Sequence, residues 1–255
     1  MMKGILFDKD GTLLNFEKLW LDAAKYVIWE FCFINHLTVG DEVEKFLLKT
    51  IGVEENTIRH DGPLAYMTYE QIGAVLADAL NHPMQKDYPD KLQRETIRQK
   101  RVFSQELTGR QIQVLFETVF EREALTCAPT CDLKELFVGL RKKGICIGLA
   151  TADNKRITER CLKELEIDQK FDFIGCDNGI LKPKPKPDMF DAFCKECHLL
   201  PGEVAVVGDT VNDMCFAKTC GGIAIGTLSG LADEDALKPF ADIIVHTPLE
   251  VLQLI

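Results

Sequence analysis

The sequence predicts an α/β protein in which a doubly wound parallel sheet carries an inserted, all-helical module. After Ala128, short β-branched runs alternate with helix-length amphipathic segments, which is the pattern of βαβ units. Before it, apolar residues recur at the helical period and no strand signal of comparable strength interrupts them. We therefore expect residues 1–15 and 128–255 to form the α/β core and residues 16–127 to form the helical module.

The core begins with a short buried strand. The apolar run Gly4–Phe7 is partly β-branched, and it stops abruptly at Asp8-Lys9-Asp10-Gly11. Such a sequence is typical of a strand that ends in a tight polar turn. Because a turn at the end of a buried strand can present functional side chains, this turn is a candidate site.

Three apolar patterns of helical period make up the inserted module. They predict helices around residues 16–31, 69–79 and 114–120. The charged run 91–101 indicates a solvated helix face and no particular partner. Because 46% of its 255 residues are hydrophobic, the chain can bury either one large core or a medium core and a smaller attached domain.

The second part of the core alternates helices and strands. The pattern predicts a helix at Asp132–Lys143 that Gly144 stops, a strand at Ile145–Ala150 and a helix at Lys155–Leu165. Further strands are predicted at 173–174, 204–207, 223–225 and 243–245. Strands separated in this way favour a parallel sheet that is covered on both faces.

Two pairs of carboxylates follow predicted strands. Asp8 and Asp10 follow the first strand, and Asp209 and Asp213 follow the strand-like run 204–207. The carboxyl ends of parallel strands meet at one edge of the sheet, where ligands bind, so four carboxylates would converge there. An Asx-type turn for the first pair and a helix cap for Asp213 are the ordinary interpretations of each pair alone. Together, the two pairs predict a site for a hard cation such as Mg²⁺.

Two further segments supply groups that suit phosphate. Thr151-Ala152 ends a predicted strand with a hydroxyl and with the N–H groups of a strand-to-helix turn. The loop 182–188 carries three lysines between prolines. A polyproline-like surface spacer explains this loop too, but one lysine fixed beside phosphate would offset charge in a transition state. These segments favour phosphoryl transfer.

The overall charge and the N-terminal sequence exclude several classes of partner. A formal net charge of -10 repels polyanions, so we expect no nucleic-acid partner and a phosphate site of local character. No apolar run reaches the roughly 18 to 20 residues that span a bilayer, and no signal peptide precedes the first strand. We expect a cytoplasmic protein without a membrane partner, and the sequence leaves the oligomeric state unknown.

The ten cysteines show no compact disulfide framework. Cys194-Lys195-Glu196-Cys197-His198 fits the pattern for haem attachment, and its thiols and imidazole could also bind zinc. However, Phe190, Phe193, Cys194 and Cys197 recur at helical spacing. This spacing favours a buried helix face with reduced thiols over a metal or haem site.

In order and spacing, four segments resemble the motifs of phosphatases of the haloacid dehalogenase (HAD) superfamily. They are Phe7-Asp8-Lys9-Asp10-Gly11-Thr12, Ala150-Thr151, Lys184-Pro185-Lys186-Pro187-Asp188-Met189-Phe190 and Gly208-Asp209-Thr210-Val211-Asn212-Asp213. The segments 226–230 and 241–244 look like the phosphoglycolate phosphatase-like branch, which carries a helical cap after the first motif. The resemblance covers residues 1–15 and 128–255, whereas residues 16–127 match only in position and helical character. It implies a Rossmann-like core with a helical cap domain.

The resemblance also implies a role for each matching residue. Asp8 would attack phosphorus, and Asp10 would protonate the leaving alcohol and then activate water. Thr151, the Ala152 amide and Lys184 would hold the phosphoryl oxygens. The chain would thus be a phosphatase that hydrolyses a small phosphorylated metabolite, phosphoglycolate-like or a sugar phosphate, through an aspartyl-phosphate intermediate.

The same resemblance implies the ligands of a Mg²⁺ cofactor. They would be the Asp8 carboxylate, the Asp10 backbone carbonyl and Asp209, with Asp213 binding directly or through water. This set agrees with the carboxylate pairs described above, because a weak carboxylate nucleophile needs a cation to approach a phosphate dianion.

Two other functions within this fold stay open as alternatives. Phosphonatases and dehalogenases lack an aspartate two residues after the nucleophile, so Asp10 argues against both. A sugar phosphomutase shares this aspartate, and a phosphate-binding protein without turnover would share the fold. Thr12 is closer to the phosphatase pattern. Lys9 stands where many relatives carry an apolar residue, and the sequence assigns it no role.

Substrate specificity is expected to depend on the helical module. Arg59 and His60 lie in a turn-like break between its helices, where they could reach a carboxylate or hydroxyl of the substrate. An ordinary polar loop has the same composition. These two residues are therefore candidate specificity residues on position alone.

Overall fold

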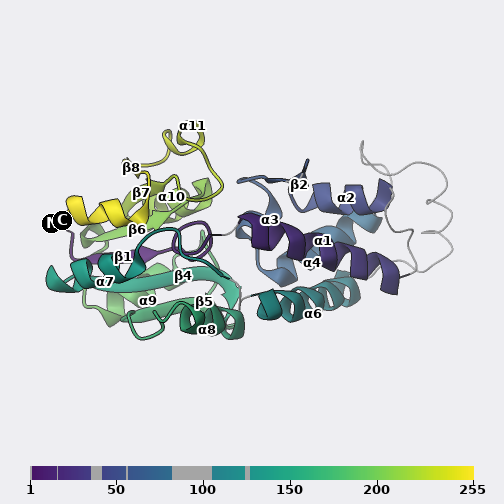
Figure 1. Ribbon diagram of the computed structural model, residues 1–255, viewed down its shortest axis with the longest axis horizontal. Helices are drawn as coiled ribbons and strands as arrows, with labels where there is room; N and C mark the ends of the chain where they lie inside the picture. The colour runs from purple at the N-terminus through teal and green to yellow at the C-terminus, as the bar shows by residue number, and fades with distance from the viewer. Residues whose placement is uncertain (1, 16, 36–41, 56, 82–104, 124–126) are drawn as a thin grey trace. The chain divides into compact units, whose positions relative to one another are not determined.

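The computed structural model describes residues 2–15, 17–35, 42–55, 57–81, 105–123 and 127–255 (Figure 1). Two compact units emerge, one formed by Met1–Leu19 and Ala124–Ile255 and the other by Trp20–Glu123. The second unit is therefore inserted into the first along the chain. Assigning them as catalytic core and cap stays a prediction.

The first unit is built on a parallel sheet of six strands in the order β5-β4-β1-β6-β7-β8 (Figure 1). The strands are β1 (Gly4–Phe7), β4 (Cys146–Asn154), β5 (Phe173–Asp177), β6 (Val204–Gly208), β7 (Ile223–Thr227) and β8 (Ile243–Val245). The sheet confirms the predicted α/β class. The first strand of the chain lies in the middle of the sheet, because β1 pairs with both β4 and β6.

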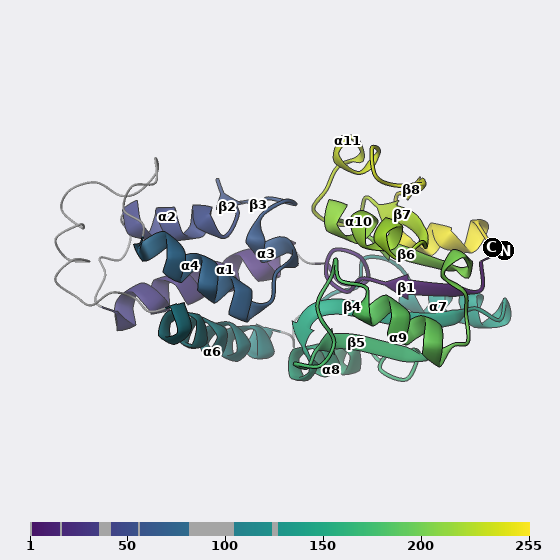
Figure 2. The ribbon, with the colours of Figure 1, turned by 180° about the vertical axis from the view of Figure 1, so that it is seen from behind.

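Helices cover both faces of this sheet, as a doubly wound fold requires. Ile5 and Phe7 point to one face of the sheet. That face packs against α7 (Leu133–Lys142), Leu162 of α8 (Lys155–Glu164) and η3 (Pro248–Gln253). Leu6 points to the opposite face, where helices of the C-terminal half pack. These helices are α9 (Asp188–Glu196), α10 (Val211–Thr219) and α11 (Glu234–Leu237), and Figure 2 shows α9 and α10 from their own side. The short helix η2 (Pro201–Glu203) precedes β6.

Side-chain caps explain where the helices around the site begin. Asp132 accepts a hydrogen bond from the Glu135 amide at 2.9 Å, and Asn154 does the same for the Ile157 amide at 2.9 Å. Such caps satisfy backbone donors that have no partner inside the helix. The starts of α7 and α8 therefore lie where the sequence predicts them.

Strand β4 is longer than the predicted Ile145–Ala150. It continues to Asn154, which pairs with Asp177 of β5, and the pairing of the two strands is irregular between Ala150 and Asn154. Pairing with the neighbouring strand holds the backbone extended beyond the apolar run. The segment that contains Thr151 is thus the end of a strand and not the expected turn.

The second unit contains α1 (Glu17–Ile34), α2 (Glu42–Thr50), α3 (Pro63–Tyr66), α4 (Tyr69–Asn81) and α6 (Gln105–Glu123). Aromatic rings form much of its core. The rings of Tyr69 and Phe116 stack with their centroids 5.2 Å apart, and the ring centroids of Trp20 and Phe120 are 3.8 Å apart. The predicted helices at 16–31, 69–79 and 114–120 correspond to α1, α4 and α6, whereas the charged run 91–101 lies outside the described residues.

The inserted unit is not entirely helical, which corrects the expectation of an all-helical module. Strands β2 (Val53–Glu54) and β3 (Thr57–Ile58) form a short antiparallel hairpin. Val53 pairs with Ile58, and both side chains are buried. Strands of two residues are too short to produce an alternating pattern that sequence analysis can recognise.

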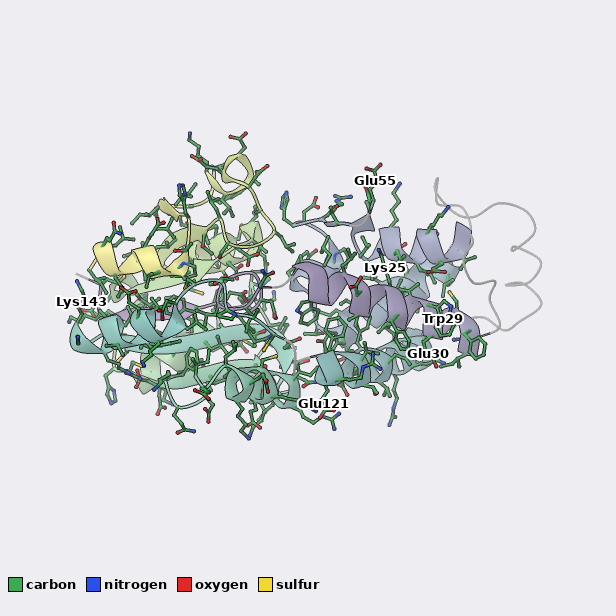
Figure 3. The ribbon with its side chains drawn as sticks, in the orientation of Figure 1. Lys25, Trp29, Glu30, Glu55, Glu121 and Lys143 are labelled. Atoms are coloured by element: carbon green, nitrogen blue, oxygen red, sulfur yellow. The ribbon has the colours of Figure 1, made fainter. Side chains whose placement is uncertain are left out.

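Helix α1 presents aromatic side chains on its exposed side as well as apolar ones on its buried side. Trp29 is 38% exposed and stacks on Phe33, which is 61% exposed, at a centroid distance of 5.6 Å. Figure 3 shows the Trp29 side chain beyond the ribbon of α1. Even so, within the described ranges no helix combines the length and the apolar character needed to cross a bilayer.

The ten cysteines are free thiols, and all of them lie in the described residues. Cys194 lies on α9, where it belongs to the buried cluster that includes Phe190 and Phe193. Among the described residues, the metal-type cluster found contains only aspartates. Cys194 thus lies on the buried face of α9, as its helical spacing predicts, whereas Cys197 at the end of the helix is only partly buried and His198 is exposed.

Candidate active site

The register of the central strands brings three loops to one edge of the sheet. Phe7 is level with Leu149 on one side and with Val207 on the other. Because the strands are parallel, Asp8 and the residues that follow Leu149 and Val207 emerge at the same edge. This arrangement places Thr151 and Asp209 at the same edge as Asp8, although they are 143 and 201 residues away from it along the chain.

Lys184 connects two of the predicted site carboxylates. Its Nζ lies 2.5 Å from Asp8 Oδ1 and 2.6 Å from Asp213 Oδ1. The lysine is only 8% exposed. Burial alone would lower the pKa of this ammonium, but Asp213 and Asp8 outweigh burial and raise it. Lys184 is therefore held as a cation against Asp8.

Asp213 caps a helix and also faces Lys184. It lies in the first turn of α10, where its Oδ2 accepts hydrogen bonds from Thr210 Oγ1 at 2.6 Å and from the Thr210 amide at 3.2 Å. The Asp213 amide donates to Thr210 Oγ1 at 3.4 Å, which completes a capping box. The cap uses Oδ2 and leaves Oδ1 for Lys184 and the site.

Asp209 is buried in a cradle made mostly of backbone. Its Oδ2 accepts the Leu231 amide at 2.8 Å, and its Oδ1 accepts Thr12 Oγ1 at 3.3 Å. A Cβ placed on Gly11 would lie 2.2 Å from Asp209 Oδ2, and one on Gly230 would lie 2.0 Å from it. Only glycine permits such a close approach of two backbone segments to one carboxylate.

Asp8, Asp209 and Asp213 form one group, in which a carboxylate oxygen from each lies within 4.8 Å of the others. Three carboxylates here face one ammonium, that of Lys184. Burial, followed by the charges of Asp8 and Asp213, raises the pKa of Asp209 well above its usual range. Burial also raises the pKa of Asp8 to about 7, although Lys184 opposes this shift. Such a set of crowded oxygen donors fits a hard divalent cation.

Asp10 does not belong to this group, although it is only two residues from Asp8. Both of its carboxylate oxygens contact Lys9 Nζ, at 2.7 and 2.6 Å. Lys9 is fully buried and also lies 2.8 Å from Asp153 Oδ2. Burial raises the pKa of Asp10 to about 7, against the opposing effect of Lys9. The first motif thus contributes one carboxylate to each of two separate ion-pair groups.

Thr151 and Ala152 lie at the same edge of the sheet, near the end of β4. Thr151 is buried, and its hydroxyl accepts a hydrogen bond from the Asp153 amide at 3.1 Å. Ala152 is half-buried. The register of β4 against β1 places both residues close to the loop of Asp8.

Arg59 and His60 belong to the inserted unit and are not part of the groups described above. Arg59 donates two hydrogen bonds to the carboxylate of Asp61, at 2.9 and 2.7 Å, and lies 3.5 Å from Glu54. Its side chain is about half exposed, at 49%. The guanidinium is therefore engaged in local, solvent-exposed ion pairs.

Several residues that shape the site were not singled out from the sequence as functional. Asp153 and Thr210 hold site residues through side-chain contacts, and Leu231 does so through its amide. For Lys9, the sequence did contain an indication: it is a charged residue between two carboxylates, at a motif position where many relatives carry an apolar residue. The backbone amide of Leu231 could not be predicted from the sequence, because every residue except proline carries such a donor.

Comparison with known proteins gives consistent matches over most of the chain. A family model described as haloacid dehalogenase-like hydrolase matches residues 2–221. The phosphorylated carbohydrates phosphatase of Thermotoga maritima is 25% identical over 256 residues, covering 100% of this chain and 98% of that protein. The pyrophosphatase PpaX of Bacillus mycoides is 24% identical over 238 residues, covering 92% of this chain and 89% of that protein. The crystal structure of a hydrolase from Pseudomonas syringae shares the fold, with a TM-score of 0.68, 20% identity and coverage of 99% and 97%.

Proposed function

Because this chain belongs to the haloacid dehalogenase-like hydrolases, we propose that it is a Mg²⁺-dependent phosphatase that forms a phosphorylated Asp8 intermediate. One observation carries the proposal. Asp8, at the end of the central strand, lies against Lys184 and within a group of three buried carboxylates, while a second carboxylate, Asp10, is held separately nearby. These residues provide candidates for a nucleophile, a cation site and a proton carrier at one edge of the sheet.

Asp8 is the proposed nucleophile. Its carboxylate oxygen attacks phosphorus as the bond between phosphorus and the leaving oxygen breaks, so the phosphoryl group passes to Asp8. Lys184 Nζ, 2.5 Å from Asp8 Oδ1, is placed to hold a phosphoryl oxygen during this transfer. The Thr151 hydroxyl and the Ala152 amide are the further proposed phosphate-binding groups.

Asp10 is the proposed acid and base. It donates a proton to the leaving oxygen in the first step, and it takes a proton from the water that attacks phospho-Asp8 in the second. Inorganic phosphate is then released, and Asp10 holds a proton for the next cycle. Its carboxylate contacts Lys9 and lies outside the Asp8 group, which favours a role in proton transfer over one as a metal ligand.

The proposed Mg²⁺ ligands are Asp8, Asp209, Asp213 and the backbone carbonyl of Asp10. The three carboxylates fit a cation because their oxygens lie within 4.8 Å of one another and, in the described part of the chain, Lys184 is the ammonium paired with them. When bound, Mg²⁺ would neutralise charge so that a phosphate dianion can approach a carboxylate. Asp209, fixed between glycine backbones, would hold its ligand oxygen in place.

The proposed substrate is a small phosphorylated metabolite, phosphoglycolate-like or a sugar phosphate. Relatives named for pyrophosphate and for phosphorylated carbohydrates support this class. The inserted unit is the proposed cap, and Arg59 and His60 remain its candidate specificity residues. Ten free thiols are compatible with the reducing compartment expected from the sequence, the cytoplasm.

The test is phosphate release from a panel that contains pyrophosphate, phosphoglycolate, sugar phosphates and para-nitrophenyl phosphate. We expect turnover with Mg²⁺, loss of turnover with chelator, and no turnover by Asp8→Asn. Acid quenching of wild type with substrate should leave phosphate on the peptide that contains Asp8. Interconversion of sugar phosphates without phosphate release would favour the phosphomutase alternative, and phosphate binding without any turnover would favour the binding protein.

A further inference from the structure

Lys9, the charged residue between Asp8 and Asp10, is completely buried. A buried ammonium needs partners for its charge and its three donors. Asp10 and Asp153 provide them, with Lys9 Nζ at 2.7 and 2.6 Å from the two oxygens of Asp10 and at 2.8 Å from Asp153. The Lys9 ammonium is thus held between two carboxylates, those of Asp10 and Asp153.

The contacts of Lys9 restrict where the Asp10 carboxylate can lie. The ammonium touches both Asp10 oxygens, so rotation of that carboxylate would break at least one contact. Asp153 is 5% exposed and holds Lys9 from the β4 side. Without this anchor, Asp10 would be free to turn towards the adjacent group of Asp8, Asp209 and Asp213, where a cation would attract it.

We propose that Lys9, anchored by Asp153, is a positioning residue that fixes the Asp10 carboxylate for proton transfer and keeps it apart from the Asp8 group. This inference rests on the proposed phosphatase function. Lys9 need not touch the substrate for this role. Its three donors allow it to retain Asp153 and one Asp10 oxygen while the other Asp10 oxygen carries the transferred proton.

The consequence is a specific dependence on the leaving group. An alkyl phosphate releases a strongly basic alkoxide, which needs a proton as its bond to phosphorus breaks. Para-nitrophenyl phosphate releases a stable phenolate that needs none. Because kcat/KM reports the steps up to release of the leaving group, misplacement of Asp10 should lower kcat/KM for the alkyl phosphate and affect the aryl phosphate far less.

The experiment compares wild type, Lys9→Met, Asp153→Asn and the double variant on phosphoglycolate and para-nitrophenyl phosphate. For Lys9→Met, we expect kcat/KM to fall at least ~10-fold more on phosphoglycolate than on the aryl phosphate. Asp153→Asn, which leaves the contacts between Lys9 and Asp10, should give a smaller difference of the same sign. A sugar phosphate replaces phosphoglycolate if wild type turns it over faster.

The double variant separates positioning from folding. It removes one buried cation and one buried anion together, so its Tm should exceed that of Lys9→Met, whose two carboxylates lack their shared cation. If Lys9 positions Asp10, the double variant should still show a larger loss of kcat/KM on the alkyl phosphate than on the aryl phosphate, even though its Tm is higher than that of Lys9→Met. If the ratio of the two kcat/KM values returns to that of wild type, or never changes in Lys9→Met, the positioning role is refuted.

Failure of this inference is distinct from failure of the proposed function. If wild type hydrolyses neither substrate nor any of the panel, the phosphatase function itself is wrong, and the Lys9 role falls with it. If wild type is active and Asp10→Asn shows the leaving-group effect but Lys9→Met does not, then only the Lys9 role is wrong.

Discussion

Two buried lysines meet the two aspartates of one short motif, and their surroundings differ. Asp8 meets Lys184, whose sequence position is 176 residues away, together with Asp209 and Asp213 from a third loop. Asp10 meets Lys9, its direct neighbour, together with Asp153. The first group joins residues of three loops, whereas the second joins two adjacent residues of one loop to Asp153 of β4. Identical side chains can therefore acquire different chemistry from their neighbours alone.

The charge balance of the two groups differs as well. Three carboxylates and one ammonium leave the Asp8 group with a formal charge of -2. Two carboxylates and one ammonium leave the Lys9 group with -1. The Asp8 group therefore has the greater need of an added cation, while the Lys9 group is nearer to neutrality. This difference supports our proposal that Asp8 binds metal and Asp10 transfers protons.

Replacing Asp8 should have the largest effect. Asp8→Asn removes the proposed nucleophile while keeping the shape of the side chain, so we expect phosphate release to fall to below about one thousandth of the wild-type rate. The measurement is Mg²⁺-dependent phosphate release by protein with an unchanged circular dichroism spectrum. Residual turnover above a tenth of wild type would remove Asp8 from its proposed role.

Loss of Lys184 should rank next. Lys184→Met leaves Asp8 and Asp213 without their shared cation and removes a proposed phosphate contact, so kcat/KM should fall about 100- to 1,000-fold. The matched control is Lys186→Met, which changes an exposed lysine of the same loop. Equal losses in both variants would show that the loop, and not the ion pair, is responsible.

The glycine cradle of Asp209 should affect metal binding more than chemistry. A Cβ on Gly230 would lie 2.0 Å from Asp209 Oδ2, so Gly230→Ala must displace the carboxylate or the loop. We expect the Mg²⁺ concentration for half-maximal activity to rise about 10- to 100-fold. Gly202→Ala is the control, because no atom lies within 4 Å of the Cβ there. A normal Mg²⁺ requirement in Gly230→Ala would show that the cradle does not set metal affinity.

The smallest effect expected is a pH dependence of stability in the absence of metal. Burial raises the pKa of Asp8 and of Asp10 from 3.8 to about 7. The folded state thus binds more protons than the unfolded state between these values, so the free energy of unfolding falls as pH rises from about 4 to about 7. Added Mg²⁺ should therefore raise Tm more at pH 8 than at pH 5. Thermal unfolding with chelator and with Mg²⁺ measures this, and a larger Mg²⁺ effect at pH 5 would contradict it.

Local patterns in the sequence predict the sheet and the convergence of Asp8, Asp209 and Asp213, because each residue follows a short apolar strand. The first strand lies at the predicted Gly4–Phe7. The separation of Asp10 from that group was beyond such patterns. It depends on the direction of one side chain, which Asp153 and Lys9 determine through contacts across the fold.

Other differences have the same origin in tertiary contacts. Pairing with β5 extends β4 to Asn154, beyond the apolar run that predicted the strand. In α6, the predicted helical region begins at Val114, which is 53% exposed, whereas Phe116 and Phe120 of the same helix are buried. Periodicity gives the type of element, and packing decides which residues at its margins are covered.

The position of β1 in the middle of the sheet has a consequence for biosynthesis. Gly4–Phe7 is translated before its two neighbours, β4 and β6, which begin at Cys146 and Val204. Asp8 therefore leaves the ribosome well before Asp209 and Asp213, the carboxylates that complete its surroundings. A chain interrupted before residue 204 would lack one flank of β1 and two of the three clustered carboxylates, so incomplete products of translation would carry the proposed nucleophile without the means to use it.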